Sequence, residues 1–470
     1  MKRSIVWFRN DLRVHDNEAL VDAIKHSDEI VPVYILDPRI IYGKTSFGFR
    51  KRGRFRAQFL IEALTDLRSR LQALNSNLYI RIGHPEDVIP QLARACRTHY
   101  VYCNRERTQE EVDVQDALEQ KLWSIGQEMR YYRGKMLYYT ADLPFPITHC
   151  PDQFTQFRKE VEKIVKVRLP HDAPICKLDS LSIELEEGDI PSLEELDYKS
   201  SASDYTQGHR FVGGETAGLA ELNYYVWDSH LIKKYKETRN GLLGRDYSSK
   251  FSAYLSLGCL SPKLVYNEIS KYENEHGSND STYWLKFELM WRDFFRFMGK
   301  KHGNSIFRLT GTRNIMPDFA NDNMTLFEKW KDARTGIPFI DSNMRELNTT
   351  GFMSNRGRQL VASFLVKDMK LNWLMGAEYF ESMLVDYDPC SNYGNWNYVA
   401  GVGADTREDR YFMIPSQARR YDPQAEYIKY WLPELETIAP ELLFNPFEQE
   451  ASLALQQVDY TQPCVHIKNW

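Results

Sequence analysis

Carboxylates, amides and aromatic rings lie unusually close together in residues 384–401, LVDYDPCSNYGNWNYVAG. Two aspartates stand two residues apart, ahead of Asn392, Trp396 and Tyr398. Aromatic side chains stack on flat ligands, while amides and carboxylates hydrogen-bond the polar edges of such ligands. The segment is too polar for a core element and too aromatic for an ordinary loop. Its composition favours a binding site for a planar ligand, although the signal is weak when taken alone.

Residues 244–262, GRDYSSKFSAYLSLGCLSP, place small hydroxyl side chains and a lysine ahead of a helical run. These side chains are Ser248, Ser249, Lys250 and Ser252. Hydroxyls and free backbone N–H groups at the start of a helix form a natural cradle for phosphate. The alternative is a cluster of N-cap residues without a ligand, which this signal taken alone favours.

Residues 286–297, KFELMWRDFFRF, carry Glu288, Trp291, Arg292 and Phe295 at helical spacing. Residues three, four and seven positions apart share one face of a helix. A carboxylate, an indole and a guanidinium on one face fit a ligand site. An ion pair between Glu288 and Arg292 beside a core tryptophan is the common alternative.

Residues 351–368, GFMSNRGRQLVASFLVKD, gather hydrogen-bond donors at the start of a helix that then becomes apolar. The donors are Asn355, Arg356, Arg358 and Gln359. They are either ligand-binding groups or the solvated first turn of an ordinary helix.

Strands and helices alternate in the first part of the chain. Helical patterns separate four apolar runs of strand length, at 3–9, 31–37, 78–83 and 100–104. This alternation predicts a doubly wound, Rossmann-like parallel sheet over residues 1–135. A proline-rich and acidic interdomain connector wrapped on the surface is expected over 136–212, and helices alone over 213–470. The expected fold class is therefore α/β followed by all-α.

Ligands of such sheets bind at the carboxyl ends of the strands. The first strand here is followed by NDLRVHDN, which contains neither GxGxxG nor GxxxxGK[ST]. The sheet is therefore a poor candidate for ordinary dinucleotide or P-loop binding.

Composition excludes several classes of protein. The 470 residues carry a formal charge of -5, so any nucleic-acid contact must come from a local basic surface. The 7 cysteines form no CxxC and the 11 histidines no HExxH, so we expect free thiols and no metal site. No secretory segment or long apolar run is visible, and we expect a cytoplasmic protein without a membrane span.

The four segments described above occur along the chain together with three further motifs, RNDLRVHDN, GGETAG and TGIPFIDSNMREL, and the seven form a series in a fixed order. The series closely resembles the photolyase/cryptochrome family of flavoproteins, and within it the DASH cryptochromes. The resemblance covers nearly the whole chain and is weakest across residues 140–210. It implies a C-terminal helical domain that binds FAD.

By position, the resemblance assigns the FAD contacts. Asn392 matches the residue that faces the flavin N5, and an amide there suggests a fully reduced working state. The remaining matches are Tyr235, Arg239, Ser248, Ser249, Lys250, Phe251, Ser252, Arg292, Arg358, Asp386 and Asp388.

The activity implied is that of a deoxyribodipyrimidine photo-lyase, in which excited reduced FAD passes an electron to a cyclobutane pyrimidine dimer. Glu288 aligns with the carboxyl group that hydrogen-bonds the dimer. The walls and rim of the lesion pocket align with Trp291, Asn355, Arg356, Gln359 and Tyr398. No histidine lies in 353–357, where (6-4) photolyases carry a histidine pair, so (6-4) repair is disfavoured.

Two positions depart from the classical dimer photolyases in the direction usual for the DASH group. Tyr398 stands where they carry a second lesion-stacking tryptophan, and Gln359 replaces their methionine. A smaller ring offers less stacking, and extracting a dimer from a duplex costs a few kcal/mol that a single strand does not require. We therefore expect repair mainly in single-stranded or looped DNA.

Family members reduce their flavin along a chain of three tryptophans. Trp396 matches the tryptophan nearest the flavin and Trp373 the middle one. The distal position falls on Ala320, beside Phe319, so the terminal electron donor is left open.

The resemblance also implies a methenyltetrahydrofolate antenna in a cleft between the domains. Glu111, in residues 103–115, is the best match for its acidic contact. An exposed helix start with i,i+4 charge pairs is the alternative. We further expect a monomer, and the resemblance leaves RNA open as a second partner.

The leading hypothesis is thus an enzyme. The alternative is a blue-light photoreceptor that signals through a nucleic-acid or protein partner, which the short, ordered remainder after Trp396 disfavours. A light-independent flavin oxidoreductase is disfavoured because no motif for a hydride-donor nucleotide is present.

Overall fold

Five parallel strands form one sheet in the computed structural model, which describes residues 2–174, 178–199, 207–317, 321–403, 411–467 and 470. The order β3-β2-β1-β4-β5 confirms the predicted doubly wound sheet. The strands are β1 (Arg3–Phe8), β2 (Glu29–Leu36), β3 (Tyr79–Ile82), β4 (Tyr100–Asn104) and β5 (Glu128–Tyr132). The sequence patterns missed β5, because an edge strand pairs on one side only and this one is more exposed and polar than the central strands.

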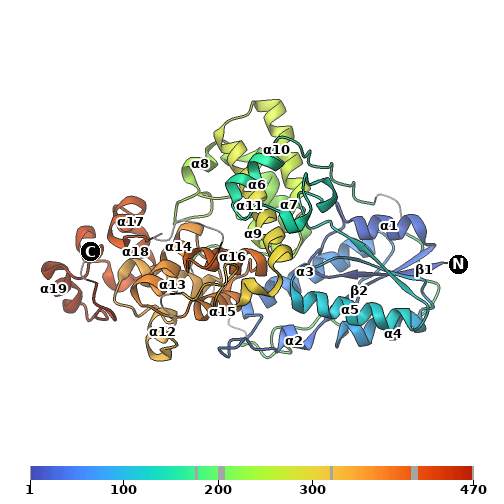
Figure 1. Ribbon diagram of the computed structural model, residues 1–470, viewed down its shortest axis with the longest axis horizontal. Helices are drawn as coiled ribbons and strands as arrows, with labels where there is room; N and C mark the ends of the chain where they lie inside the picture. Colours follow the sequence, from blue (N-terminus) through green and yellow to red (C-terminus); the bar gives the residue numbers. More distant parts are fainter. Residues whose placement is uncertain (1, 175–177, 200–206, 318–320, 404–410, 468–469) are drawn as a thin grey trace.

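Helices cover both faces of the sheet (Figure 1). Side chains alternate along a strand, so Val6 and Phe8 pack with the helices of one face while Ile5 and Trp7 pack with those of the other. The first face carries α1 (Glu18–His26) and α3 (Arg54–Ala73), the second α4 (Pro85–Ala95) and α5 (Gln109–Trp123). A short α2 (Pro38–Ile41) follows β2.

The second half of the chain is helical, as predicted (Figure 1). The Ser261 side chain caps one of these helices, Pro262–His276, by accepting from the backbone N–H groups of its first turn. The helices are α7 (Glu215–Asn223), α8 (Tyr235–Thr238), α9 (Ser252–Ser256), α10 (Pro262–His276), α11 (Asp280–His302), α12 (Met324–Lys331), α13 (Pro338–Thr350), α14 (Asn355–Ser363), α15 (Trp373–Met383), α16 (Pro389–Val399), α17 (Ile414–Tyr421), α18 (Glu426–Trp431) and α19 (Gln449–Gln457).

The connector is only partly the surface segment that we expected. It contains α6 (Phe154–Val161), whose side chains Phe154, Phe157 and Val161 are buried against α11. These three residues have helical spacing, but the prolines and acidic residues around them hide the pattern. The prediction of a wholly surface connector is therefore wrong.

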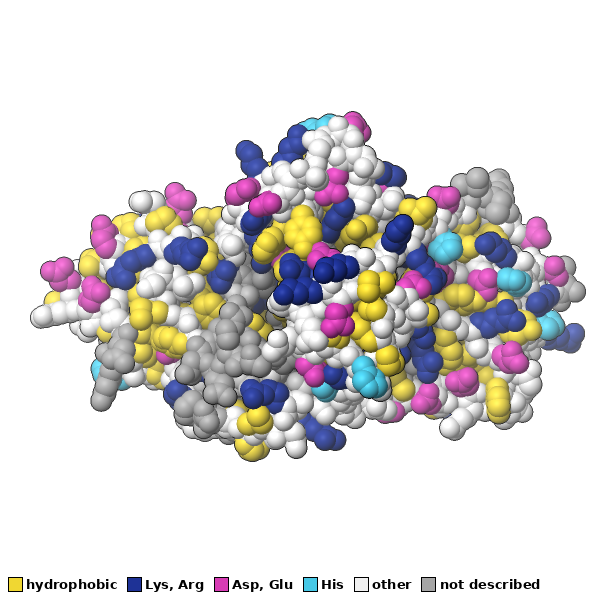
Figure 2. All heavy atoms as spheres, turned by 45° about the horizontal axis from the view of Figure 1, so that its top comes forward, with side chains coloured by type: hydrophobic (Ala, Val, Ile, Leu, Met, Phe, Trp, Pro, Cys, Tyr) yellow, Lys and Arg dark blue, Asp and Glu magenta, His cyan; other side chains and the backbone are white. Residues whose placement is uncertain are grey.

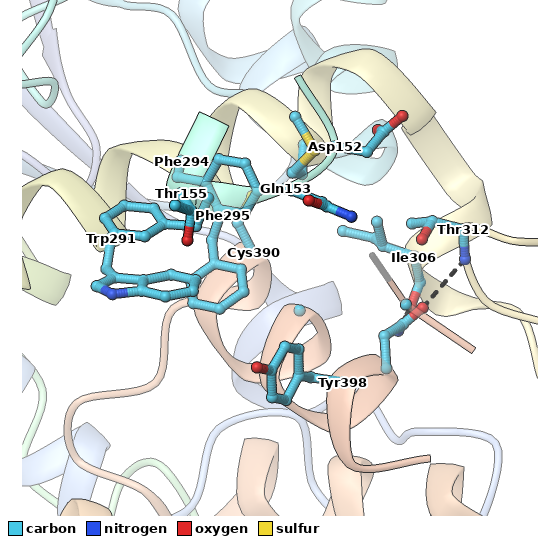
Figure 3. A pocket seen from close by; sticks show the side chains of 15 residues that line it. Asp152, Gln153, Thr155, Trp291, Phe294, Phe295, Ile306, Thr312, Cys390 and Tyr398 are labelled. Carbon is cyan, nitrogen blue, oxygen red and sulfur yellow. Dashed lines mark hydrogen bonds between the residues drawn. The ribbon is translucent and has the colours of Figure 1, made fainter. Parts of the chain in front are cut away.

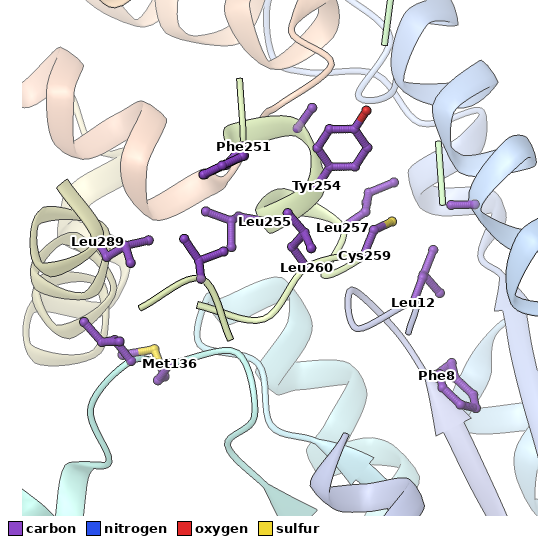
Figure 4. Packing of buried hydrophobic residues seen from close by; sticks show 14 of the residues in the cluster. Phe8, Leu12, Met136, Phe251, Tyr254, Leu255, Leu257, Cys259, Leu260 and Leu289 are labelled. Atoms are coloured by element: carbon purple, nitrogen blue, oxygen red, sulfur yellow. The ribbon is translucent and has the colours of Figure 1, made fainter. Parts of the chain in front are cut away.

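One hydrophobic core spans both halves of the molecule. Phe8 of β1, Leu12, the α9 segment and Leu289 of α11 belong to the same buried cluster (Figure 4). The Leu12 N–H donates to the Leu257 carbonyl at 3.1 Å. A Cβ on Gly258, which has a φ of +69°, would lie 2.2 Å from the Asn10 carbonyl oxygen, so the two segments touch through backbone. The RNDLRVHDN motif therefore holds the segment that follows α9.

Candidate functional site

The predicted phosphate cradle holds a buried cation without an acidic partner. Lys250 has a φ of +54°, and its ammonium group lies 3.3 Å from the centre of the Tyr247 ring and 4.7 Å from that of Phe352. No ion pair joins Lys250 to a carboxylate within the described residues. Burial lowers the pKa of Lys250 to about 7. An anionic ligand would supply the counter-charge that this buried cation lacks.

The rest of the cradle is unevenly exposed. Ser249 and Phe251 are buried, Ser248 is half-buried, and Ser252 is exposed at the first position of α9. The buried hydroxyl group of Tyr247 has no hydrogen-bond partner. An orphaned hydroxyl beside an unpaired ammonium fits the pyrophosphate of a dinucleotide.

Arg358 and Asp386 form an ion pair at a second side of the site. Arg358 Nη2 lies 2.9 Å from Asp386 Oδ2, and the buried Asp386 Oδ1 has no partner.

Glu346 was missed by the sequence analysis. Burial raises the pKa of Glu346 to about 7, and its carboxylate accepts a 2.7 Å hydrogen bond from Tyr427.

Glu288 pairs with Arg239, which lies 49 positions earlier in the chain. Burial raises the pKa of Glu288. Tyr235 is buried nearby, with the Arg239 guanidinium 6.0 Å from its ring centre. Arg292 instead donates to the carbonyls of Lys135 at 2.7 Å and Leu255 at 3.2 Å, so the local Glu288–Arg292 pair does not form.

The segment that opens the sequence analysis is the helix α16. Asp388 caps it, with Oδ1 accepting from the Ser391 N–H at 2.9 Å. Asn392 Nδ2 donates to the Ala377 carbonyl at 3.0 Å, which leaves Oδ1 as the acceptor that a ligand can use. Gly394 is required by packing, because a Cβ there would lie 2.4 Å from the Phe295 ring.

A buried chain of charges joins α16 to the α/β domain. Lys135 Nζ contacts Glu106 at 2.6 Å, Arg296 Nη2 contacts Glu106 at 3.4 Å, and Arg296 Nη1 contacts Asp388 at 2.6 Å. Burial alone would raise the pKa values of Glu106 and Asp388, but the neighbouring cations lower both to about 2. Sequence analysis missed Lys135, Glu106 and Arg296. The position of Arg296, one turn after Arg292 on the same helix, was the available signal.

A pocket of about 410 Å³ brings Trp291 and Tyr398 together (Figure 3). In Figure 3, the Phe295 ring lies between the Trp291 indole and the Tyr398 ring. Phe154 stacks on Trp291 with 3.7 Å between ring centres. The other residues predicted for the lesion do not line this pocket.

Those other residues lie at the start of α14 and on α11. Asn355 is exposed. Arg356 donates to Gln359 Oε1 at 2.9 Å and to Asn240 Oδ1 at 3.1 Å, and its guanidinium lies over the Tyr421 ring. Gln359 is half-buried, and so is Glu288 on α11. Of the predicted lesion groups, this pocket therefore gathers Trp291 and Tyr398 alone.

A larger cleft of about 940 Å³ lies between the two domains. Its walls include Trp7 and Glu111 from the α/β domain and Tyr387 from the helical domain. Burial and the neighbouring Glu106 raise the pKa of Glu111, which accepts from Thr108 Oγ1 at 2.8 Å. Arg52 and Arg56 also line this cleft, and each is buried with at least one unpartnered N–H group. Orphaned donors beside an acidic side chain suit a heterocyclic ligand.

Trp396 and Trp373 are both buried in the core of the helical domain. The Trp396 ring lies 6.5 Å from Trp330 and 5.2 Å from Phe380 between ring centres, while Trp373 contacts Tyr393 at 6.3 Å. Trp330 was not singled out from the sequence. Phe319 and Ala320 lie outside the described residues.

Lys and Arg side chains gather near the middle of the face shown in Figure 2, beside exposed hydrophobic side chains. Such a local surface can contact nucleic acid despite the negative net charge. Within the described chain, no helix is long and apolar enough to cross a membrane, and no group of three or more His, Cys, Asp or Glu side chains is placed to hold a metal ion.

Two family models match the chain. Residues 4–175 match the model described as DNA photolyase, and residues 284–470 match the FAD binding domain of DNA photolyase. The second match begins within α11, runs to residue 470 and includes Glu288, Arg358 and Asn392.

Curated relatives resemble the chain over most of its length. A cryptochrome DASH of Arabidopsis thaliana, named chloroplastic/mitochondrial, is 50% identical over 93% of this chain and 77% of the relative. A cryptochrome DASH of Synechocystis sp. is 47% identical over 98% of this chain and 95% of the relative.

Solved structures agree with this resemblance. The crystal structure of a Synechocystis cryptochrome superposes with a TM-score of 0.94 at 46% identity, covering 99% of this chain and 97% of that one. An archaeal photolyase from Sulfolobus tokodaii, described with two FAD molecules, gives a TM-score of 0.80 at 27% identity, covering 99% and 96%.

Proposed function

The chain belongs to the photolyase/cryptochrome family, within its DASH cryptochrome group, and on that premise we propose that it repairs cyclobutane pyrimidine dimers under blue light. The preferred substrate is a dimer in single-stranded or looped DNA. One observation carries this proposal. Helix α16 places Asn392 and Trp396 on one face and Tyr398 on the other, where Tyr398 shares a pocket with Trp291. One rigid element thus links the expected cofactor side to the expected substrate side.

The residues of the site fit FAD. Lys250 and Tyr247 would hold the pyrophosphate, and Arg358 with Asp386 would border the ring system. Reduced FAD, when bound, supplies the electron that splits the dimer under light. Asn392 Oδ1 would accept a hydrogen bond at the flavin edge without adding charge.

The substrate side is built from aromatic and ionisable groups. Trp291, stacked on Phe154, offers a fixed ring against which a base can stack. Burial favours the protonated form of Glu288, which could then donate a hydrogen bond to a carbonyl of the lesion once Arg239 turns away. The cleft with Glu111 would take methenyltetrahydrofolate as antenna. A cytoplasmic location and a monomeric state stay predictions.

Blue-light repair of a dimer-bearing oligonucleotide tests the proposal. The substrate is supplied single-stranded and as a duplex, to protein whose flavin has been chemically reduced. We expect light to restore the absorbance of the single strand at 260 nm. This recovery should be faster than in the duplex, and it should not occur in the dark. If the protein shows a flavin spectrum but repairs neither substrate, the hypothesis of enzymatic repair is refuted and the photoreceptor hypothesis is favoured.

Tyr398→Trp tests the origin of the single-strand preference. A larger ring stacks more strongly, and the pocket around residue 398 has the volume to take it. We expect duplex affinity to rise about 3- to 10-fold relative to single-strand affinity, because the larger ring adds only part of the about 1–3 kcal/mol per base that stacking contributes. Competition binding with both substrates measures this ratio, and Tyr398→Phe, which keeps the ring size, should leave it unchanged. A ratio that does not move in Tyr398→Trp would remove stacking as the explanation.

Trp373→Phe tests the path by which the flavin is reduced. We expect light-driven reduction of the bound flavin to be lost, while chemically reduced protein still repairs the dimer. Absorbance at 450 nm under light with an external reductant follows the reduction. Trp330→Phe is the matched comparison, because the Trp330 ring lies 6.5 Å from Trp396. Reduction that persists in Trp373→Phe but is lost in Trp330→Phe would move the path to Trp330.

A further inference from the structure

Four cations gather where the carboxyl end of the sheet meets the end of α11. Arg105 and Arg133 directly follow the paired residues Asn104 and Tyr132 of β4 and β5, and the Arg105 N–H donates to the Tyr132 carbonyl at 2.9 Å. The other two cations are Arg107 and Lys300. Arg105 and Lys300 are exposed, while Arg107 and Arg133 are half-buried.

None of the four forms an ion pair with a carboxylate of the described chain, and the acids nearby have other partners. Glu106 contacts Lys135 and Arg296, and Glu110 contacts Lys51. The Arg105 guanidinium instead lies 5.0 Å from the Tyr131 ring centre. The cluster therefore carries an uncompensated charge of about four units, and like charges at short range repel one another.

Burial and the neighbouring positive charges together lower the pKa values of two of these cations. Partial burial and the three arginines lower the pKa of Lys300 to about 8. Burial, Arg296, Arg133 and Arg105 lower the pKa of Arg107 to about 10. A multiply charged anion at this position would relieve the repulsion.

The cluster stands at the edge of the interdomain cleft. Arg107 lines the cleft itself, as does Asn304 in the turn that follows α11. We propose that Arg105, Arg107, Arg133 and Lys300 bind the multiply negative tail of a ligand whose ring system lies in this cleft. The chemistry suits an oligoglutamyl chain, as on a folate, or the phosphate of a flavin nucleotide. This inference rests on the antenna part of the proposed function.

Ligand titrations that vary only the tail test the proposal. Methenyltetrahydrofolate with one glutamate is compared with the form that carries five, and riboflavin with flavin mononucleotide. Absorbance or fluorescence of the ligand reports binding to the FAD-loaded protein in the dark. We expect the longer or phosphorylated tail to increase affinity about tenfold at low salt and much less at high salt, because several exposed charge pairs each contribute modestly and salt screens them.

The triple variant Arg105→Gln/Arg133→Gln/Lys300→Gln should lose most of the preference for the longer or phosphorylated tail. It keeps Arg107, which lines the cleft. The control Lys25→Gln/Arg94→Gln/Lys163→Gln removes the same charge from exposed positions elsewhere and should keep the tail dependence. The folate and flavin pairs show which tail the cluster takes.

Three outcomes would overturn the inference. Equal affinity for short and long tails in the unaltered protein refutes it and leaves the antenna standing. Loss of single-stranded DNA binding in the triple variant, with the tail dependence intact, assigns the cluster to nucleic acid. Failure of every one of these ligands to bind refutes the antenna and the tail site together, while repair remains testable by itself.

Discussion

Lys250→Met is expected to stabilise the FAD-free protein against unfolding and to weaken FAD binding about 10- to 100-fold. The FAD-free protein holds the Lys250 ammonium in a buried position between two aromatic rings without a carboxylate partner. A buried unpaired charge opposes folding, and methionine removes that penalty at similar volume. The same charge would pair with the pyrophosphate of FAD, where hydrogen bonds to charged groups contribute about 1.5–3 kcal/mol.

Thermal unfolding of the FAD-free proteins and FAD titrations measure the two effects. Lys250→Arg keeps the charge and should retain most of the affinity. A variant that loses stability and affinity together would show that Lys250 is structural and does not bind the phosphates.

The pH dependence of the free energy of unfolding tests the same effect of the buried Lys250 charge. Burial lowers the pKa of Lys250 to about 7, from about 10.4 in an unfolded chain. Between these two values the unfolded chain binds the proton and the folded FAD-free protein does not, so the free energy of unfolding falls as pH falls from about 10 to about 7. Lys250→Met should lack this component. FAD favours the charged lysine, so FAD affinity should decrease as pH rises above about 7, and this decrease should also disappear in the variant.

Arg296→Met is expected to lower the free energy of unfolding by about 3–5 kcal/mol, because it leaves a buried carboxylate without its cation. Arg296 is fully buried and contacts both Asp388 and Glu106. Lys135 would still neutralise Glu106, so the uncompensated charge would be that of Asp388. Urea unfolding monitored by circular dichroism measures the change.

Two further variants show whether the loss of stability comes from the buried charges. Lys301 lies on the same helix and contacts the exposed Asp152 at 2.9 Å, so Lys301→Met should cost about 1 kcal/mol or less. The double variant Arg296→Met/Asp388→Asn removes both charges and should recover part of the loss. Equal losses in Arg296→Met and Lys301→Met would contradict the assignment of a buried network.

The same network predicts how acid acts on the protein. The cations hold the pKa values of Asp388 and Glu106 near 2, below those of an unfolded chain, which are about 4. The stability from these carboxylates is therefore complete above about pH 4 and is lost as pH falls towards 2. Arg296→Met should be less sensitive over this window, since much of the stabilisation has already been removed.

Local signals predicted the elements well where one helix or strand carried its own pattern. The expectation of helices alone after residue 213 was confirmed, and the apolar runs gave four of the five strands. The edge strand β5 and the connector helix α6 were missed because each depends on contacts with distant elements. In the helical part of the chain, the helical turns that follow Glu215 are interrupted at His230, which has a φ of +51°. No spacing rule indicated this break.

Residue chemistry was predicted better than residue partners. The sequence pointed to Lys250, Asp388, Asn392, Trp291 and Tyr398, and their ligand roles stay predictions. It suggested a local partner for Glu288 in Arg292, but the tertiary structure pairs Glu288 with Arg239. It offered no reason to join Arg296 to Glu106, or Trp330 to Trp396.

The amino-acid sequence by itself thus determined the classes of secondary structure, the family and the chemical groups available to a site, because periodicity, caps and motifs act over a few neighbouring residues. Only the tertiary structure decided which charges neutralise one another, which rings touch, and which cations are left without partners. These outcomes depend on distances between segments far apart in the chain, as in the contact of Lys135 with Glu106 and of Arg296 with Asp388. Burial then sets the strength of each such contact, and no residue determines its own burial.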